Sequence, residues 1–464
     1  MTISTASRQV DVIRPPDADS SLGTLLRTWR KRALLTQEQL AERAGLNVRT
    51  VRRLEHDGLQ QPRIRSILLL AEALRLDGAE RATLVTVARG PSASAEHDDP
   101  AGSGRPPIPR QLPAGVAAFV GRRRELMALA DYHENASTMT VVAIDGMAGV
   151  GKTALAVHAA HRLTSRFPDG QLFVNLHGHT EEMSPVDPGD ALARVLRTLG
   201  VVDEHIPEHI DDRAALYRSV LADRKILIVL DNAADEDQVR PLLPAGPGCG
   251  LIITSRRRLI ALDGTRTLSL DVLPPREAVA LFTRTAGKEQ VADAPATVLV
   301  EIVERCGLLP LAIRIAAVQL QARATWSAGH LLNRLTDDRL AELTAGPHSV
   351  TAALDLSYQR LSEEQRRVYR LLGSHVGTEF GAAEAAAALG TTVTRARRLL
   401  ERLLDVHLLR ESAPCRYRFH DLVRDHVSAL LHQTDAIDDL HGVDGGVRFR
   451  VVKGLVGRAD RSWV

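Results

Sequence analysis

Apolar residues recur at helical spacing through the first part of the chain. Four sets follow one another: Leu22, Leu25, Leu26 and Trp29; Leu40, Ala41 and Ala44; Val51 and Leu54; Ile67, Leu68, Ala71 and Leu74. Because residues three or four positions apart share one face of a helix, each set predicts an amphipathic helix. The spacing predicts a compact all-helical domain over residues 21–86.

A different pattern, of short and continuous apolar runs, begins further along. The runs cover residues 140–145, 225–231 and 250–256. Runs of this length without polar alternation are typical of strands buried in a parallel sheet. The first run is followed by a helical stretch, residues 154–160. We therefore expect an α/β domain with a parallel sheet over residues 115–265.

Helical patterns return after this domain. The stretch from Pro274 to Phe282 begins a helical subdomain, expected over 266–348. Leu399, Leu400, Leu403 and Leu404 form an apolar stripe in a further helical domain, expected over 349–432. Three segments lack such patterns: an arm over 1–20, a Pro-, Gly- and Ser-rich linker over 87–114, and an irregular tail over 433–464.

Composition narrows the class of protein. With 464 residues, 44% of them hydrophobic and 25% charged, the chain predicts about three globular domains. Only 3% of residues are aromatic, which favours helices and parallel sheets over aromatic-rich sandwiches. Cys249, Cys306 and Cys415 form no C-x-x-C motif and fit a reducing cytosol. No apolar run approaches ~18 residues and no signal segment is present, so we expect a cytoplasmic protein without membrane contact.

One segment carries a phosphate-binding motif. Gly146, Met147, Ala148, Gly149, Val150, Gly151, Lys152 and Thr153 fit G-x-x-x-x-G-K-[ST], between a strand and a helix that begins at Ala154. Glycines allow backbone N–H groups to surround a polyphosphate, lysine adds a point charge, and the threonine hydroxyl reaches Mg²⁺. The segment predicts binding of a nucleotide with its magnesium ion.

Two later strands end in residues that suit the same site. The run 225–231 ends in Asp231, which we expect to serve Mg²⁺ together with Thr153. The run 250–256 ends in Arg256, a candidate for sensing a γ-phosphate, or alternatively a surface arginine at a strand end. We expect Lys152, Thr153, Asp231 and Arg256 to carry any phosphate chemistry.

Residues 36–55 have the anatomy of a helix-turn-helix. Thr36 and Asn47 stand where they can cap the two helices, and Gly45 permits the turn between them. If Val51 and Leu54 face the core, residues on the opposite face of the second helix meet base edges. The candidate DNA-binding residues are Gln37, Asn47, Arg49, Thr50 and Arg53, with Arg52, Arg63 and Arg65 near phosphates.

The charge of this first domain fits that interpretation. Residues 21–85 carry 12 basic and 7 acidic side chains, whereas the whole chain has a net charge of only +2. Including the trailing helix 69–74, the segment resembles the phage-repressor-like (XRE-type) helix-turn-helix family, which implies binding to double-stranded DNA. The alternative is a helical module that binds protein, with its arginines solvated.

The ordered motifs from Phe119 to Leu431 resemble the NB-ARC branch of the signal-transduction ATPases with numerous domains (STAND), as found in actinobacterial-type transcriptional regulators. The resemblance implies a P-loop domain, a helical subdomain and a winged-helix domain. It implies that Val120, Gly121 and Arg122 bind the adenine end, that Pro310 lies near the base, and that His420 contacts the β-phosphate of ADP.

Three positions depart from the family pattern. Phe419 replaces the methionine before His420, and Leu308 replaces a glycine two residues before Pro310. Asn232 stands where the family has a second acidic residue, so the group that polarises water is unassigned, with Asp235 and Glu236 as guesses. Retention of nucleotide is therefore a safer expectation than its hydrolysis.

Together these features predict a DNA-binding regulator switched by nucleotide. ADP would hold the ATPase module closed through His420, and ATP would open it for self-association, with a separate protein as a candidate sensor. One alternative is an oligomerisation scaffold or defence-type switch whose head binds protein. Another is a repressor with a structural ADP that never exchanges.

Overall fold

The structure, a computed structural model, describes residues 22–33, 35–44, 46, 48–55, 64–74, 76–89, 108–134, 139–181, 183–346, 348–375 and 377–441. The chain divides into two compact units, Met1–Gly104 and Arg105–Val464. The expected arm, residues 1–20, lies outside the described residues. Among the described helices, none combines the length and apolar character needed to cross a membrane.

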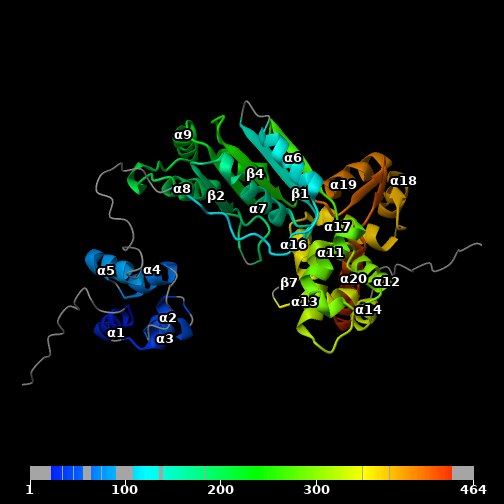
Figure 1. Ribbon diagram of the computed structural model, residues 1–464, viewed down its shortest axis with the longest axis horizontal. Helices are drawn as coiled ribbons and strands as arrows, with labels where there is room; N and C mark the ends of the chain where they lie inside the picture. Colours follow the sequence, from blue (N-terminus) through cyan, green and yellow to red (C-terminus); the bar gives the residue numbers. More distant parts are fainter. Residues whose placement is uncertain are drawn as a thin grey trace, which may run out of the picture. The chain divides into compact units, whose positions relative to one another are not determined.

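The N-terminal unit is all-helical, as its apolar spacing predicts (Figure 1). Its helices are α1 (Leu22–Arg32), α2 (Gln37–Ala44), α3 (Val48–Glu55), α4 (Ile64–Ala73) and α5 (Gly78–Arg89). Val51 and Leu54 are buried, which confirms that this face of α3 points into the core. Thr36 caps α2, because its hydroxyl accepts from the backbone N–H of Gln39 (3.2 Å) and Gln39 returns the bond (2.9 Å).

A buried ion pair ties α1 to α3. The side chain of Glu55 accepts hydrogen bonds from Arg30 Nε (2.6 Å) and from the amide of Gln37 (2.7 Å). Arg27 adds a bond to the Glu55 carbonyl (2.7 Å). These contacts orient α3, the second helix of the helix-turn-helix, relative to α1 and α2.

The C-terminal unit contains a five-stranded parallel sheet of order β2-β3-β4-β1-β5, of which Figure 1 labels β2, β4 and β1. The strands are β1 (Thr140–Gly146), β2 (Gly170–Asn175), β3 (Ile226–Ala233), β4 (Gly250–Ser255) and β5 (Thr265–Leu270). The helices of this region are α6 (Arg123–Glu134), α7 (Lys152–Leu163), α8 (Pro188–Thr198), α9 (Ile210–Leu221) and α10 (Glu236–Val239), with short 3-10 turns η2 (Thr164–Arg166), η3 (Asp203–His205) and η4 (Arg240–Leu242).

Alternate strand residues face opposite layers, so both faces of the sheet are buried. Val142 and Ile144 pack in the cluster that holds α6 and α7, whereas Val141 and Ala143 pack in the cluster that holds α8 and α9. This is the arrangement that continuous apolar strands require, since a strand covered on both faces cannot alternate with polar residues. The expected parallel sheet is confirmed.

The linker expected over 87–114 is shorter than the sequence suggests. Helix α5 continues to Arg89, and Arg110 pairs in parallel with Gln171 of β2. The Gln171 N–H donates to the Pro109 carbonyl (2.7 Å). Strand β2 is an edge strand with unpaired backbone groups, and this segment satisfies some of them.

Helices make up most of the remainder. The first group is α11 (Pro275–Ala286), α12 (Ala296–Arg305), α13 (Pro310–Ala322), α14 (Ala328–Asp337) and α15 (Arg339–Glu342), with η5 (Glu289–Val291). A two-stranded hairpin, β6 (Thr344–Ala345) and β7 (His348–Ser349), leads to the last domain. That domain contains α16 (Val350–Gln359), α17 (Glu363–His375), β8 (Phe380–Gly381), α18 (Ala382–Leu389), α19 (Val393–Asp405), β9 (Arg410–Ala413), β10 (Arg416–Arg418) and α20 (Asp421–His441).

The last domain has helices flanking a small three-stranded sheet of order β8-β10-β9, which fits the expected winged helix. The tail expected to be irregular over 433–464 is in part helical, because α20 continues to His441. No glycine or proline interrupts the sequence from Asp421 to His441, and the next residue in the sequence is a glycine, a residue type common directly after helices.

Candidate functional site: a phosphate loop packed against the winged helix

The phosphate loop connects β1 to α7 in a conformation that only its glycines adopt easily. Gly149 and Gly151 have φ of 79° and 97°, in the left-handed region. A Cβ on Gly149 would lie 2.9 Å from the Leu311 Cβ, so α13 also approaches too closely for a side chain. The loop therefore presents backbone rather than side chains at this point.

Lys152 begins α7 and is buried. Its ammonium donates to the carbonyls of Gly146 (2.8 Å) and Met147 (2.9 Å). Burial, with the nearby charge of Arg256, lowers the pKa of Lys152 to about 7, although Asp231 and Asp145 oppose the shift. A buried cation held only by carbonyls is favoured further by an anion, because the anion would compensate its lost hydration.

Asp231 lies at the carboxyl end of β3 and joins two hydroxyl groups. Its Oδ1 accepts from Thr153 Oγ1 (2.7 Å) and from Thr254 Oγ1 (2.7 Å). Asp231, Thr153 and Thr254 come together because β3, β4 and β1 are parallel neighbours in the sheet, so their carboxyl ends lie at the same edge. A carboxylate and a threonine hydroxyl are oxygen ligands of the kind that Mg²⁺ takes.

These groups line a cavity of about 360 Å³ at the sheet edge. Of the residues expected from the sequence, it brings together Gly149, Gly151, Lys152, Thr153, Ala154, Asp231, Arg256 and Pro310. Thr254 and Arg314 also line it and were missed. Arg314 follows Pro310 by one helical turn, and that spacing is the signal that could have found it.

The three residues expected to bind the adenine end, Val120, Gly121 and Arg122, contact the phosphate loop or the core next to it. Arg122 is buried, and its guanidinium donates to the carbonyls of Val150 (3.2 Å) and Asp271 (2.5 Å). Gly121 precedes it with φ of 71°, and a Cβ there would meet the Glu277 carboxylate. Val120 packs, half-buried, against the hydrophobic core. These three residues join the start of the domain to the phosphate loop and to α11.

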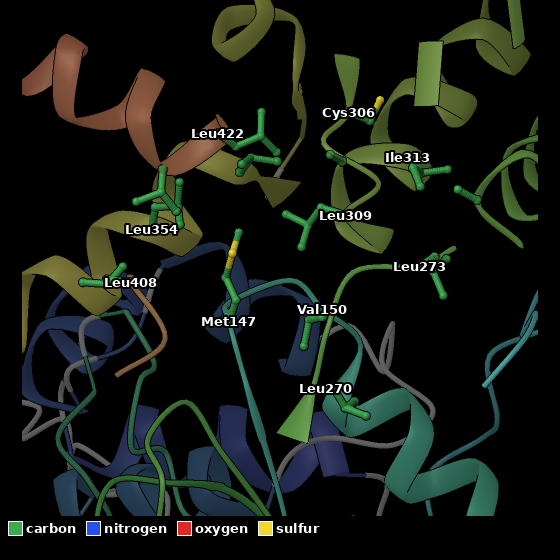
Figure 2. Packing of buried hydrophobic residues seen from close by; sticks show 14 of the residues in the cluster. Met147, Val150, Leu270, Leu273, Cys306, Leu309, Ile313, Leu354, Leu408 and Leu422 are labelled. Carbon is green, nitrogen blue, oxygen red and sulfur yellow. The ribbon is translucent and has the colours of Figure 1, made fainter. Parts of the chain in front are cut away.

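The apolar members of the loop point into the core. Met147, Ala148 and Val150 are buried. Figure 2 shows Met147 extending from the loop toward Leu354 of α16 and Leu422 of α20, with Leu309 beside it. The hydrophobic core is thus continuous from the phosphate loop to the winged helix, and a shift of one requires the other to repack.

Arg256 links the same two regions through polar contacts. Its Nη1 donates to the Ala353 carbonyl (2.6 Å) and to Ser357 Oγ (2.9 Å), both on α16. Burial lowers the pKa of Arg256 to about 10, so the group still carries its charge near neutral pH. Arg256 therefore contacts the winged helix while it lines the cavity beside Lys152.

His420 lies apart from Lys152. Its Nδ1 accepts from the Leu422 N–H (3.2 Å) and its Nε2 lies 2.8 Å from the Gly307 carbonyl, which assigns the proton to Nε2. Burial lowers the pKa of His420, although the bond to Gly307 opposes the shift. His420 lines a separate cavity of about 370 Å³ that also contains Met147 and His407.

Two of the residues that depart from the family pattern, Leu308 and Asn232, adopt left-handed backbone conformations. Leu308 adopts φ of 56°, the left-handed conformation for which the expected glycine is suited. Asn232 adopts φ of 58°, and its side-chain amide donates to Thr180 Oγ1 (3.1 Å). Asp235 caps α10 by accepting from the Gln238 N–H (3.0 Å) and lines a different cavity from Lys152. Glu236 also lies on α10 and is absent from the described lining of the Lys152 cavity.

The expected DNA-binding residues are only partly described. Thr50 is half-buried on α3, and Gln37 at the start of α2 is bonded to Glu55. Asn47 and the side chains of Arg49 and Arg53 lie outside the described residues. Arg52, exposed on the same helix, pairs with Glu38 at 2.7 Å.

Comparisons with known proteins match this architecture. Residues 21–84 match the helix-turn-helix domain model, and residues 125–292 match the NB-ARC domain model. The chain is 46% identical over 336 residues to the regulatory protein AfsR of Streptomyces coelicolor, covering 70% of this chain and 34% of that protein. It is also 46% identical over 342 residues to the regulatory protein AfsR of Streptomyces griseus, covering 73% and 35%.

A more distant structural similarity is to a signal-transduction ATPase with numerous domains and a tetratricopeptide repeat sensor from Pyrococcus horikoshii. It has a TM-score of 0.35 and 20% identity, covering 70% of this chain and 44% of that one. The chain spans about a third of the length of the two Streptomyces proteins. From its motifs, its parallel sheet and the two domain models, the chain combines a helix-turn-helix domain with an NB-ARC domain.

Proposed function

We propose that the chain is a DNA-binding transcriptional regulator whose NB-ARC domain holds ADP or ATP and changes arrangement with the nucleotide. The observation that carries the proposal is the position of the phosphate loop. Its Lys152 faces a cavity suited to phosphate, while its Met147 packs into the winged-helix core. A ligand that moves the loop from the cavity side would therefore also change the packing of Met147 against the winged helix.

The residues present fit a nucleotide with magnesium. Lys152 would neutralise phosphate charge, and loop N–H groups at the start of α7 would face the anion. Thr153 and Asp231, already joined by a 2.7 Å hydrogen bond, would hold Mg²⁺, which supplies charge neutralisation between the phosphates. Pro310 and Arg314, both on α13, also line the cavity.

The winged helix is held to the nucleotide domain by contacts that a nucleotide could alter. Arg256 bonds to α16, and Arg410 pairs with Asp271 after β5. The Arg258 N–H donates to the Asp405 carbonyl at the end of α19 (2.9 Å). We infer that ADP favours this closed arrangement and that ATP, by drawing Arg256 to its γ-phosphate, favours an open one that self-associates.

DNA binding is assigned to the helix-turn-helix domain. Its α3 has a buried face at Val51 and Leu54 and is held by the Arg30–Glu55 ion pair, as a recognition helix requires. The similarity to two regulatory proteins supports the same role. We place the protein in the cytoplasm, where its DNA would be.

Two measurements on the purified full chain test the proposal. The nucleotide released on denaturation is identified, and binding to the DNA upstream of the protein's own gene is titrated at several salt concentrations. We expect ADP or ATP in the released fraction and DNA affinity that falls steeply with salt. Absence of nucleotide would contradict the ATPase-type site, and absence of salt-sensitive DNA binding would contradict the regulator.

One observation favours a second candidate, a repressor with a permanently bound ADP. Asn232 replaces a carboxylate at the end of β3 and is held by Thr180, so it offers no base for hydrolysis. Exchange of bound nucleotide against labelled ADP and ATP separates the two candidates. A nucleotide that does not exchange over hours supports the repressor and excludes the switch.

A further inference from the structure

A second cluster of cations lies beside the nucleotide cavity. A small cavity of about 130 Å³ opens between the end of β4 and the helices α16 and α19. Four arginines line it: Arg256, Arg257, Arg360 and Arg402. They come from two domains, since the first pair follows β4 and the second pair belongs to the winged helix.

The charge of this cluster is poorly compensated. Within the described part of the chain, the side chains of Arg257 and Arg360 have no ion pair or hydrogen bond. Arg256 donates only to neutral oxygens, and Arg402 shares Glu364 with Arg395, each at 3.0 Å. The lining of this cavity contains one carboxylate, Asp405. Arg257, Arg360 and His179 also line an adjoining cavity that contains Asp187, Asp235 and Asp237, but among the described residues none of these carboxylates forms an ion pair with Arg257 or Arg360. An arrangement of this kind favours an anion.

The surroundings of His179 also show that this region is strongly positive. His179, on the loop after β2, lines the cavity, and its Nδ1 is buried without a hydrogen-bond partner among the described residues. Burial and the charges of Arg256, Lys152 and Arg360 lower the pKa of His179 to about 3, although a hydrogen bond to Asn232 opposes the shift, so the ring is neutral. Part of this lowering is repulsion by the neighbouring cations, and surroundings that disfavour a further positive charge favour an anion.

We propose that the cavity bounded by Arg257, Arg360 and His179 binds a phosphate ion, at a site separate from the nucleotide held by Lys152. Guanidinium groups match the oxygens of phosphate in pairs, which distinguishes phosphate from chloride. The cavity of about 130 Å³ has room for a small ion, and the same three residues also line an adjoining cavity of about 520 Å³. A phosphate ion there would interact both with Arg257, after β4, and with Arg360 of the winged-helix domain, and would thereby hold the two domains together.

Arg256 lines both cavities, so the terminal phosphate of a nucleotide held by Lys152 is the competing source of an anion at this site, and the test separates it from free phosphate. The two sources differ in their dependence on Lys152. Free phosphate would bind whether or not nucleotide is held, whereas a γ-phosphate requires Lys152. The proposal is therefore independent of the proposed nucleotide switch.

Calorimetric titration of the full chain with inorganic phosphate, at ionic strength matched with chloride, tests the proposal. The variants are Arg257→Gln and Arg360→Gln, and the control is Arg218→Gln. All three residues are exposed, and Arg218 lies on α9. Unchanged thermal unfolding midpoints verify that each variant folds.

We expect saturable phosphate binding that each of the two site variants weakens by about tenfold or more, as loss of a charged hydrogen bond does. With the Lys152 cavity saturated by ADP, Arg218→Gln should bind phosphate like the unchanged chain. Lys152→Ala, which loses any phosphate binding in its own cavity, should keep the saturable binding that the two site variants weaken. Three results would overturn the proposal: no saturable phosphate binding, a phosphate affinity in Arg257→Gln and Arg360→Gln equal to that of the unchanged chain, or loss of all saturable phosphate binding in Lys152→Ala.

Discussion

The imidazole of His407 lies 2.9 Å from the carboxylate of Asp145, measured from Nε2 to Oδ1. His407 belongs to the turn after α19, in the winged helix, and Asp145 is a fully buried residue of β1 directly before the phosphate loop. The distance is that of an ion pair, although the two groups are not aligned for a hydrogen bond. The winged helix thus contacts the strand that positions Lys152.

This pair predicts a local stabilisation of the closed arrangement. His407→Asn should tolerate the left-handed backbone at this position (φ 54°) but would not reach Asp145. We expect the free energy of opening of residues 405–409 to fall by about 1–3 kcal/mol, because a buried carboxylate loses its partner. Hydrogen exchange of this segment measures the effect.

A double-mutant cycle supplies the control for that prediction. In the Asp145→Asn variant, His407→Asn should have little further effect, because the partner charge is already gone. Additive effects of the two substitutions, or unchanged exchange in His407→Asn, would show that the pair does not hold the domains together.

Loss of the Lys152 ammonium should empty the nucleotide site. We expect Lys152→Ala to bind nucleotide about 10- to 100-fold more weakly, because a charge-assisted interaction with phosphate is removed. Nucleotide content after purification is the measurement. Lys288→Ala, at an exposed lysine, is the matched control. Nucleotide content equal to that of the control would overturn the assignment of the site.

Arg256 should determine how firmly α16 is held. Arg256→Gln loses the bonds to Ala353 and Ser357, so we expect exchange of α16 amides to become about tenfold faster. Ser357→Ala removes only one acceptor and should give a smaller increase. If α16 exchanges at the same rate in all three proteins, Arg256 does not tether the winged helix.

The helix-turn-helix domain should lose stability in acid. Burial alone would raise the pKa of Glu55, but bonds from Arg30 and Gln37 outweigh it, and the pKa lies below its ordinary value of 4.5. The contribution of Glu55 to the free energy of unfolding is therefore fully present above about pH 4.5, the ordinary pKa that applies to the unfolded chain. It is lost as the pH falls through the lower pKa that Glu55 has in the folded domain. Trp29 is buried in the same core and can report unfolding by fluorescence.

The control for acid unfolding is Glu55→Gln, in a background where Trp326 and Trp463 are phenylalanine. This variant should be less stable at pH 7 by about 3–5 kcal/mol, because Arg30 loses its buried partner. Its stability should also depend less on pH between 3 and 5. An equal pH dependence in both proteins would show that Glu55 does not contribute to the acid response.

Local motifs were the part of the structure that the sequence could predict. The phosphate loop, the Thr36 cap and the buried face of α3 depend on residues close together in the chain, and the structure confirms the cap and that buried face. The parallel sheet followed from continuous apolar runs in the same way.

Contacts between distant segments could not be predicted from local pattern. Thr254 meets Asp231 only because β4 lies beside β3, and Arg110 pairs with β2 only because β2 is at the sheet edge. The Asp145–His407 pair joins residues from two domains, and no sequence motif in either segment indicates that the two residues meet. The spacing of residues along one helix or strand reports only on neighbours in the sequence. These contacts depend instead on how distant segments pack together, so spacing does not predict them.

The most direct test of nucleotide control is the affinity of the full chain for its upstream DNA, measured at one salt concentration with saturating ADP and with a non-hydrolysable ATP analogue. We predict that the two dissociation constants differ by at least about fivefold, the lower range of allosteric coupling. In Lys152→Ala the difference should disappear. Equal affinity of the unchanged chain in the two nucleotide states would contradict the account.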